Sequence, residues 1–119
     1  MKRRKYLRIR VDFRSTFSGE QIEGQGKLMD LSSWGCWIES DIPVATGTAL
    51  KLRLYVPGGD SPIQIDTARV RWTNGRACGV EFIRLPAEDL ARLRQLVQDP
   101  EQQNQFTRYR EERKKSREG

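Results

Sequence analysis

The sequence predicts a small all-β domain, best described as a six-stranded antiparallel β-barrel with a C-terminal α-helix. Three observations lead to this prediction. Apolar residues alternate with charged ones in several short segments, turn-forming residues separate those segments, and a helical period appears only after residue 85. Short strands with no helices between them indicate an antiparallel barrel or a sandwich, and we favour the six-stranded barrel.

The strands are indicated by alternation of period two, which buries one face and leaves the other in water. The clearest runs are Ile9, Val11 and Phe13, then Leu50, Leu52, Leu54 and Val56, then Ala68, Val70 and Trp72. The predicted turns contain Gly24 with Gly26, Pro43 with Gly47, residues 57–60, and Asn74 with Gly75. Because Asn-Gly is the strongest short-range hairpin signal, the strands flanking it should pair antiparallel.

A helix is predicted to follow the strands and to cap the barrel. Pro86 suits its first turn, where Glu88 and Asp89 are favourable because they face the positive end of the helix dipole. The apolar residues at helical spacing are Leu90, Leu93, Leu96 and Val97.

The length of 119 residues suits one domain built around one core. We assign residues 1–98 to that domain, including a basic N-terminal arm, and residues 99–119 to a charged tail that is a frayed helix or a disordered segment. No apolar run could span a bilayer and no signal-peptide pattern opens the sequence, so a cytoplasmic protein without a membrane span is expected.

The composition narrows the classes of function. A net charge of +6 favours an anionic partner. Nucleic acid, a membrane surface and a free nucleotide are all anionic and remain open. The chain has no histidine, the commonest general base, and its acids and thiols form no recognisable catalytic pair. We therefore predict neither an enzyme nor a metal site. Cys36 and Cys78 lie in apolar segments and are expected to be buried, reduced thiols.

The basic head contains the first candidate binding residues, Arg3, Arg4 and Arg8. An arginine guanidinium can hold a phosphate through two hydrogen bonds and can also stack on a base. A bare cluster of basic residues is more commonly a solvated terminus, so this segment alone decides nothing.

A second candidate segment begins at Asp30, whose carboxylate could accept two hydrogen bonds from the edge of a guanine. Ser32 could supply a hydroxyl, and Gly35 would allow a positive φ or a close approach of the backbone. A simple Asx or Ser turn that links two strands fits the same residues.

The tryptophans carry less information. Alternation places Trp72 on the same strand face as Ala68 and Val70, which is more often a core position than a base-stacking one. It also places Trp37 in the core and leaves Trp34 partly exposed. We keep Trp72 as a candidate ligand contact.

The two candidate segments together resemble the PilZ family. Residues 4–8 match its RxxxR pattern and residues 30–35 its DxSxxG pattern, in the expected order and separation. Residues 69–82, with the Asn-Gly turn, are similar to the closing hairpin of the family, so the resemblance covers about residues 3–97. It implies a bacterial six-stranded barrel that binds cyclic di-GMP.

The resemblance also implies residue roles. Arg4 and Arg8 would hold phosphates and stack on guanine, while Asp30, Ser32 and Gly35 would meet a guanine base and the neighbouring backbone. An arginine at the position of Arg3 is associated with a stacked pair of ligand molecules, and the position of Trp72 contacts guanine in some members.

Three hypotheses follow. In the leading one, cyclic di-GMP orders the basic arm against the loop at Asp30 and changes a surface that an unidentified downstream protein reads. A nucleic-acid-binding barrel explains the charge but not the loop. A ligand-independent PilZ adaptor fits the fold, but the intact motifs count against it. Motility, exopolysaccharide synthesis and adhesion are all outputs of the family, and no residue discriminates among them.

Overall fold

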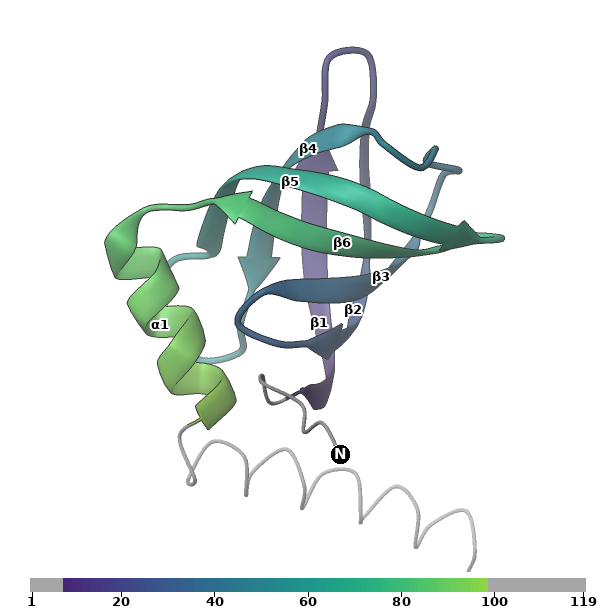
Figure 1. Cartoon of the computed structure of the whole chain (residues 1–119). Coiled ribbons are helices and arrows are strands. Elements are labelled where there is room, and N and C mark those ends of the chain that lie inside the picture. The colour runs from purple at the N-terminus through teal and green to yellow at the C-terminus, as the bar shows by residue number, and fades with distance from the viewer. Residues whose placement is uncertain (1–7, 99–119) are drawn as a thin grey trace, which may run out of the picture.

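Six antiparallel strands close into a barrel, and one helix lies beside it (Figure 1). The structure is a computed structural model that describes residues 8–98. The elements are β1 (Ile9–Ser18), β2 (Glu23–Leu31), β3 (Gly35–Ser40), β4 (Ala49–Tyr55), β5 (Ile63–Asn74), β6 (Ala77–Arg84) and α1 (Ala87–Gln98). Around the barrel the strand order is β1-β2-β3-β6-β5-β4, and β4 pairs with β1 to complete the ring. The predicted fold is confirmed.

The barrel interior is filled by the residues that alternation predicted to face inward. Leu50, Leu52 and Leu54 of β4 are all buried, and so are Phe13 and Phe17 of β1. Because the sheet closes on itself, no strand of the barrel is left with an unpaired edge on which another chain could add. The outer wall is therefore the surface on which a ligand site can be built.

The hairpin between β5 and β6 is confirmed. Asn74 pairs with Ala77, and Gly75 has a φ of +65°, a conformation that glycine adopts without steric cost. In the loops on either side of β4, Gly47 and Gly58 also have positive φ values.

The predicted turn at Gly24 and Gly26 is wrong, because both glycines lie inside β2. The chain reverses earlier, where the amide of Gly19 donates to the carbonyl of Ile22 at 2.8 Å. The glycines instead allow close packing: a Cβ on Gly24 would lie 2.8 Å from the ring of Phe17, and one on Gly26 would lie 2.5 Å from a backbone carbonyl of β3.

Helix α1 forms where the change of period predicted it. Its Leu93, Leu96 and Val97 are buried against the barrel. Arg92 holds the helix to the loop between β4 and β5, because its Nη2 donates to the carbonyl of Ser61 at 2.6 Å. Among the described residues no helix is long and apolar enough to cross a membrane.

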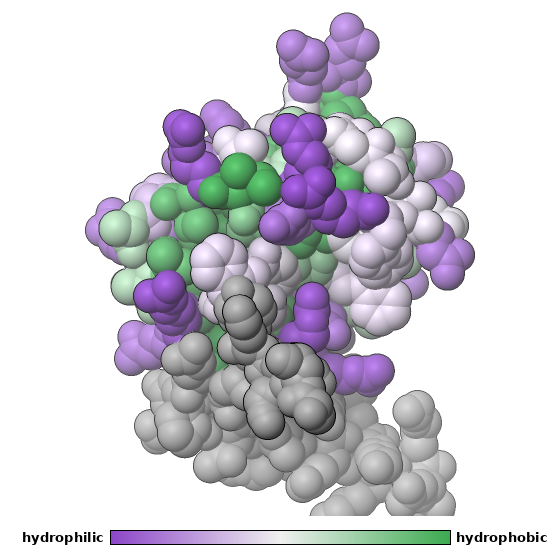
Figure 2. All heavy atoms as spheres, viewed as in Figure 1, coloured by the Kyte–Doolittle hydropathy of each residue, from purple (hydrophilic) through white to green (hydrophobic). Residues whose placement is uncertain are grey.

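The outer wall carries aromatic residues that alternation placed differently. Between Val70 and Trp72 the register of β5 against β6 shifts by a bulge, so Trp72 points outward and is 43% exposed. Trp37 is 38% exposed because it alternates with the buried Cys36 and Ile38. Both expected core positions are therefore wrong, whereas Trp34 is partly exposed as predicted. Figure 2 shows apolar and weakly polar atoms between hydrophilic side chains on the barrel wall.

Candidate functional site

A row of cross-strand neighbours runs over the outer wall. Trp72 of β5 pairs with Gly79 of β6, Gly79 pairs with Trp37 of β3, and Trp37 pairs with Asp30 of β2. These residues lie in an open hollow of about 360 Å³, which we call the tryptophan pocket. Its lining residues are Arg8, Asp30, Ser32, Trp34, Gly35, Cys36, Trp37, Arg71, Trp72, Gly79, Val80 and Glu81.

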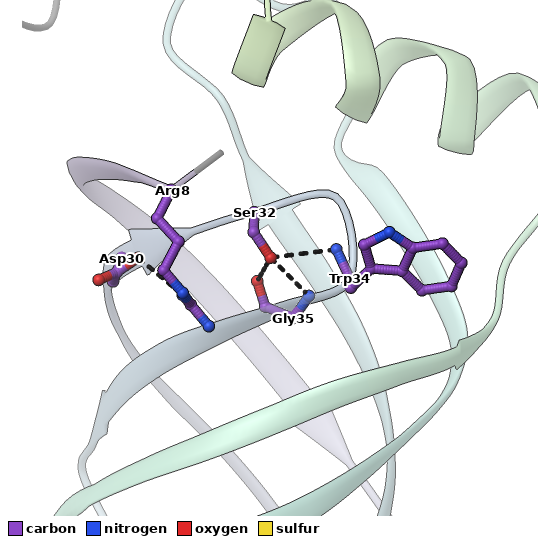
Figure 3. A network of polar contacts seen from close by, with 5 residues as sticks. All are labelled: Arg8, Asp30, Ser32, Trp34 and Gly35. Carbon is purple, nitrogen blue, oxygen red and sulfur yellow. Dashed lines mark hydrogen bonds and ion pairs between the residues drawn. The ribbon is translucent and has the colours of Figure 1, made fainter. Parts of the chain in front are cut away.

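Arg8 and Asp30 form an ion pair at one edge of this pocket (Figure 3). The Nη1 of Arg8 donates to the Oδ1 of Asp30 at 2.8 Å, although 22 residues separate the two in the chain. The Arg8 side chain is 46% exposed and that of Asp30 23%, so the pair is accessible to an incoming ligand. Pairing of β1 with β2, in which Ile9 lies opposite Leu31, brings them together.

Ser32 shapes the loop that follows Asp30. Its Oγ accepts hydrogen bonds from the backbone amides of Trp34 and Gly35, each at 3.1 Å, and donates to the carbonyl of Gly35 at 3.2 Å. The residue is only 2% exposed. The Ser32 hydroxyl thus stabilises a Ser turn. As Figure 3 shows, the indole of Trp34 points away from the Arg8–Asp30 pair.

Gly35 is required for close approach of two strands. A Cβ at this position would lie 2.5 Å from the carbonyl oxygen of Val80 on β6. Its φ is not in the left-handed region, so the positive φ considered from the sequence is wrong and the close approach is confirmed.

Trp37 and Trp72 contact each other at the centre of the pocket. Their ring centroids are 5.6 Å apart and their planes are inclined by 57°. Gly79 makes this arrangement possible, since a Cβ there would overlap the Nε1 and Cε2 atoms of the Trp72 indole. The ring of Trp72 therefore lies directly against the backbone of β6.

A second ion pair lies beside these rings in the same pocket. The Nε of Arg71 donates to the Oε1 of Glu81 at 2.6 Å, and both side chains are about half exposed. The pocket thus contains two arginine–carboxylate pairs and two exposed indoles. This combination suits a ligand that has both flat rings and negative charge.

The two cysteines supply no reactive group to the pocket. Cys36 and Cys78 are buried free thiols, as predicted. Burial raises the pKa of Cys36 well above its ordinary value, with a further contribution from Cys78, and burial also raises the pKa of Cys78. Both thiols therefore stay protonated at neutral pH, and a protonated thiol is a poor nucleophile.

The structure brings together five of the seven residues that the sequence nominated, and these are Arg8, Asp30, Ser32, Gly35 and Trp72. Arg3, Arg4 and the charged tail, residues 99–119, lie outside the described residues. No group of histidine, cysteine or acidic side chains within residues 8–98 is arranged to hold a metal ion.

Sequence reasoning nominated none of the other seven lining residues, among which Trp37, Arg71, Gly79 and Glu81 contribute a ring, charges or close packing. A signal was available for Gly79 and another for Glu81. A glycine inside a strand pattern marks a bulge or a close approach of other atoms, so Gly79 indicated contact with a large side chain on a neighbouring strand. Glu81 also alternates with the buried Val80 and Phe82, which predicts that it faces outward.

The fold and the pocket together define a class of protein: a small antiparallel barrel that presents paired arginines and exposed aromatic rings on its outer wall. A profile of the PilZ domain matches residues 2–99, and the chain belongs to this family. A search of curated proteins found no match for the chain.

Solved structures share the fold. The Bacillus subtilis inhibitor of motility MotI/DgrA is similar with a TM-score of 0.66 and 22% identity, over 82% of this chain and 50% of that one. This chain thus spans half the length of that protein. The PilZ domain of YcgR from Escherichia coli, solved with c-di-GMP, has a TM-score of 0.62 and 15% identity, over 99% of this chain and 100% of that one. The PilZ domain of CeSA from a cellulose-synthesizing bacterium has a TM-score of 0.60 and 16% identity, over 76% and 93%. Identities this low show the fold alone.

Proposed function

We propose that this chain is a non-catalytic bacterial receptor that binds cyclic di-GMP in the tryptophan pocket. The observation that carries the proposal is the accessible Arg8–Asp30 pair beside two exposed indoles in one hollow. Membership of the PilZ family and the cyclic di-GMP bound in the YcgR structure support the choice of ligand.

The chemistry of the ligand matches the pocket. Cyclic di-GMP carries two phosphates and two guanines, so it needs cations, a carboxylate and flat apolar surfaces in one place. Arg8 offers a guanidinium for a phosphate, and its present partner Asp30 offers a carboxylate for the N–H groups of a guanine edge. On binding, the ligand would replace the Arg8–Asp30 contact with one contact to each residue.

The proposal includes Arg4 and Arg3, which complete the basic motif. Four residues of chain span at most about 14 Å, so the length of the chain allows Arg4 to contact the same ligand as Arg8. We assign Arg4 to the second phosphate and Arg3 to a stacked second ligand molecule. Binding would then hold residues 1–7 against the pocket and slow protease cleavage near Lys5.

Charge distribution favours a small anionic ligand over nucleic acid. Residues 8–98 contain 12 lysines and arginines and 11 acidic residues, so the barrel itself is nearly neutral. Binding of nucleic acid depends mainly on neutralising many phosphates, which calls for a strong excess of positive charge along the binding surface. The ligand-independent adaptor is less favoured because the pocket residues of both motifs are in contact.

We further propose that residues 1–98 form the receptor and that the bound ligand changes a surface read by a downstream protein. Residues 99–119 would lie outside the binding module. The signal would pass through the loop of Ser32 and Trp34, because this loop both lines the pocket and connects β2 to β3.

The test is a calorimetric titration of the protein with cyclic di-GMP, repeated with Arg8→Ala. Hydrogen bonds to charged groups contribute about 1.5–3 kcal/mol, so the variant should bind roughly 10- to 100-fold more weakly. Arg53→Ala is the matched control, because Arg53 is an outward-facing arginine that does not line the tryptophan pocket.

Binding that is lost in Arg8→Ala and kept in Arg53→Ala would support the receptor function. The stoichiometry of the same titration tests the stacked pair assigned to Arg3. A wild-type protein that does not bind cyclic di-GMP would refute the proposal, and equal weakening by both variants would indicate a general charge effect.

A further inference from the structure

The centre of the tryptophan pocket is formed by a residue that belongs to neither binding motif. Trp37 lies between Asp30 and Gly79 in the cross-strand row, and its side chain faces outward. The Arg8–Asp30 pair stands on one side of it, and the ring of Trp72 lies on the other. Any ligand that reaches Asp30 from solvent therefore comes close to the Trp37 indole.

The two indoles hold each other in place. A lone tryptophan on a strand surface could change rotamer freely, but the ring of Trp37 packs against that of Trp72 with centroids 5.6 Å apart. Trp72 in turn rests on the backbone at Gly79, where a side chain would collide with it. The bulge between Val70 and Trp72 turns the second ring outward to make this contact. The pair is consequently one ordered surface.

The exposure of these rings also indicates binding. Tryptophans are mostly buried in soluble proteins, and neighbouring exposed apolar groups bounded by polar ones mark interaction sites. Here two adjacent indoles are 38% and 43% exposed, and two arginine–carboxylate pairs line the same pocket. Every nucleobase has a flat face that can stack on an indole.

We propose that Trp37 is a base-contacting residue, and that it and Trp72 form an aromatic platform for a purine. Directly paired residues on neighbouring strands have Cβ atoms roughly 5 Å apart, so a purine whose edge bonds to Asp30 lies with its face over Trp37. Gly79 is a positioning residue, because it seats the Trp72 ring. This inference rests on the proposed binding of cyclic di-GMP and extends it to residues outside the RxxxR and DxSxxG motifs.

The experiment compares Trp37→Leu with Trp37→Phe by titration with cyclic di-GMP. Loss of a base-stacking ring weakens binding by roughly 10- to 100-fold, which is the result expected for leucine, whereas phenylalanine should restore most of the affinity. Tyr55→Leu removes an aromatic ring from β4, outside the pocket, and should bind as the wild type does. Circular dichroism and thermal unfolding check that each variant keeps the barrel.

A spectroscopic readout separates contact from indirect structural effects. The only tryptophans of the chain are Trp34, Trp37 and Trp72, and a base stacked on an indole quenches its fluorescence. Ligand-dependent quenching should persist in Trp34→Phe, whose indole points away from the Arg8–Asp30 pair, and should decrease in Trp37→Phe, which keeps only the Trp72 indole of the platform.

The outcomes distinguish the two proposals. If Arg8→Ala loses binding while Trp37→Leu binds and is quenched as the wild type is, the platform is refuted and the receptor function stands. If the wild type binds no cyclic di-GMP, both fail. Weakening in Trp37→Leu, recovery of affinity in Trp37→Phe and a decrease of quenching in Trp37→Phe together would establish the platform.

Discussion

Two of the open hollows on the described part of the chain are similar in size but different in character. The tryptophan pocket has a volume of about 360 Å³, and a second pocket of about 380 Å³ lies over β1, β2 and β4. The lining of the second pocket includes Thr16, Glu23, Gln25, Asp41, Lys51 and Arg53. Both hollows therefore offer acids and bases, and volume does not separate them.

The difference lies in ring faces and in fixed geometry. The aromatic residue of the second pocket, Phe17, is buried in the barrel, whereas Trp37 and Trp72 expose their rings. In the tryptophan pocket the loop at Ser32 is held by its own hydrogen bonds. Of these two hollows, only the tryptophan pocket offers exposed rings on which a flat base can stack. Volume and charge alone thus do not identify the candidate site.

The largest expected effect comes from a substitution that disturbs the tryptophan pocket and leaves the second pocket intact. Ser32→Ala removes the acceptor of two backbone amides, and each buried polar group left without a partner costs about 1–3 kcal/mol. We expect the free energy of unfolding to fall by about 2–4 kcal/mol, measured by urea denaturation.

Ser33 is the matched control for this substitution. It is the next residue and also buried, yet no side-chain hydrogen bond of it is seen within residues 8–98. Ser33→Ala should change the free energy of unfolding by less than about 1 kcal/mol. Equal losses in the two variants would mean that burial, and not the hydrogen bonds of Ser32, stabilises the loop.

A smaller effect is expected when one carboxylate of each pocket is neutralised in turn and the two variants are compared. Asp30→Asn should weaken binding of cyclic di-GMP by about tenfold, because one of the two acceptor oxygens becomes an NH2 donor, which cannot bond to the N–H groups of a guanine edge. Asp41→Asn, in the second pocket, should leave the affinity unchanged. Neither should alter stability by more than about 1 kcal/mol, since partly exposed ion pairs contribute little.

Calorimetry with both variants is the measurement. An Asp41→Asn protein that binds as weakly as Asp30→Asn would shift the candidate site toward the second pocket or toward a general charge effect.

Much of this architecture could be predicted from the sequence, because the signals for it are local. Alternation in residues 50–54 and the Asn74-Gly75 turn depend only on neighbouring residues, and both predicted the structure correctly. The helical period after Pro86 is also local, and it predicted α1.

The errors arose where the pairing of two strands, and not the pattern within one strand, decides the outcome. The bulge before Trp72 depends on the register of β5 against β6, which alternation within β5 does not contain. Gly24 was predicted to be a turn residue because the sequence does not show that it packs against Phe17 on the neighbouring strand. Local patterns therefore predicted the helix and strands, but they did not predict the irregularities in strand pairing that orient side chains toward the site.

The candidate site was predictable only in part for the same reason. Arg8 and Asp30 are 22 residues apart, and only the resemblance to a family connected them before the structure did. Trp37, Gly79 and Glu81 come from β3 and β6, whose paired residues are even further apart in the chain. Only the folded barrel shows that these residues line one pocket.

The smallest expected effect concerns the second ion pair of the tryptophan pocket. Glu81 holds the Nε of Arg71 at 2.6 Å, so its carboxylate competes with any phosphate that approaches this arginine. Glu81→Gln should therefore tighten binding of cyclic di-GMP by roughly 1.4- to 5-fold, which corresponds to the 0.2–1 kcal/mol typical of an exposed ion pair.

Glu23→Gln is the control, because it removes the same charge from the second pocket. At about 0.15 M salt, charges more than about 8 Å apart are largely screened, so Glu23→Gln should leave the affinity unchanged. If both variants tightened binding equally, net charge would explain the gain. If Glu81→Gln weakened binding, the carboxylate would be a ligand contact in its own right, and the tryptophan pocket would read the guanines with Glu81 as well as Asp30. The titration therefore decides whether the second ion pair restrains Arg71 or recognises a base.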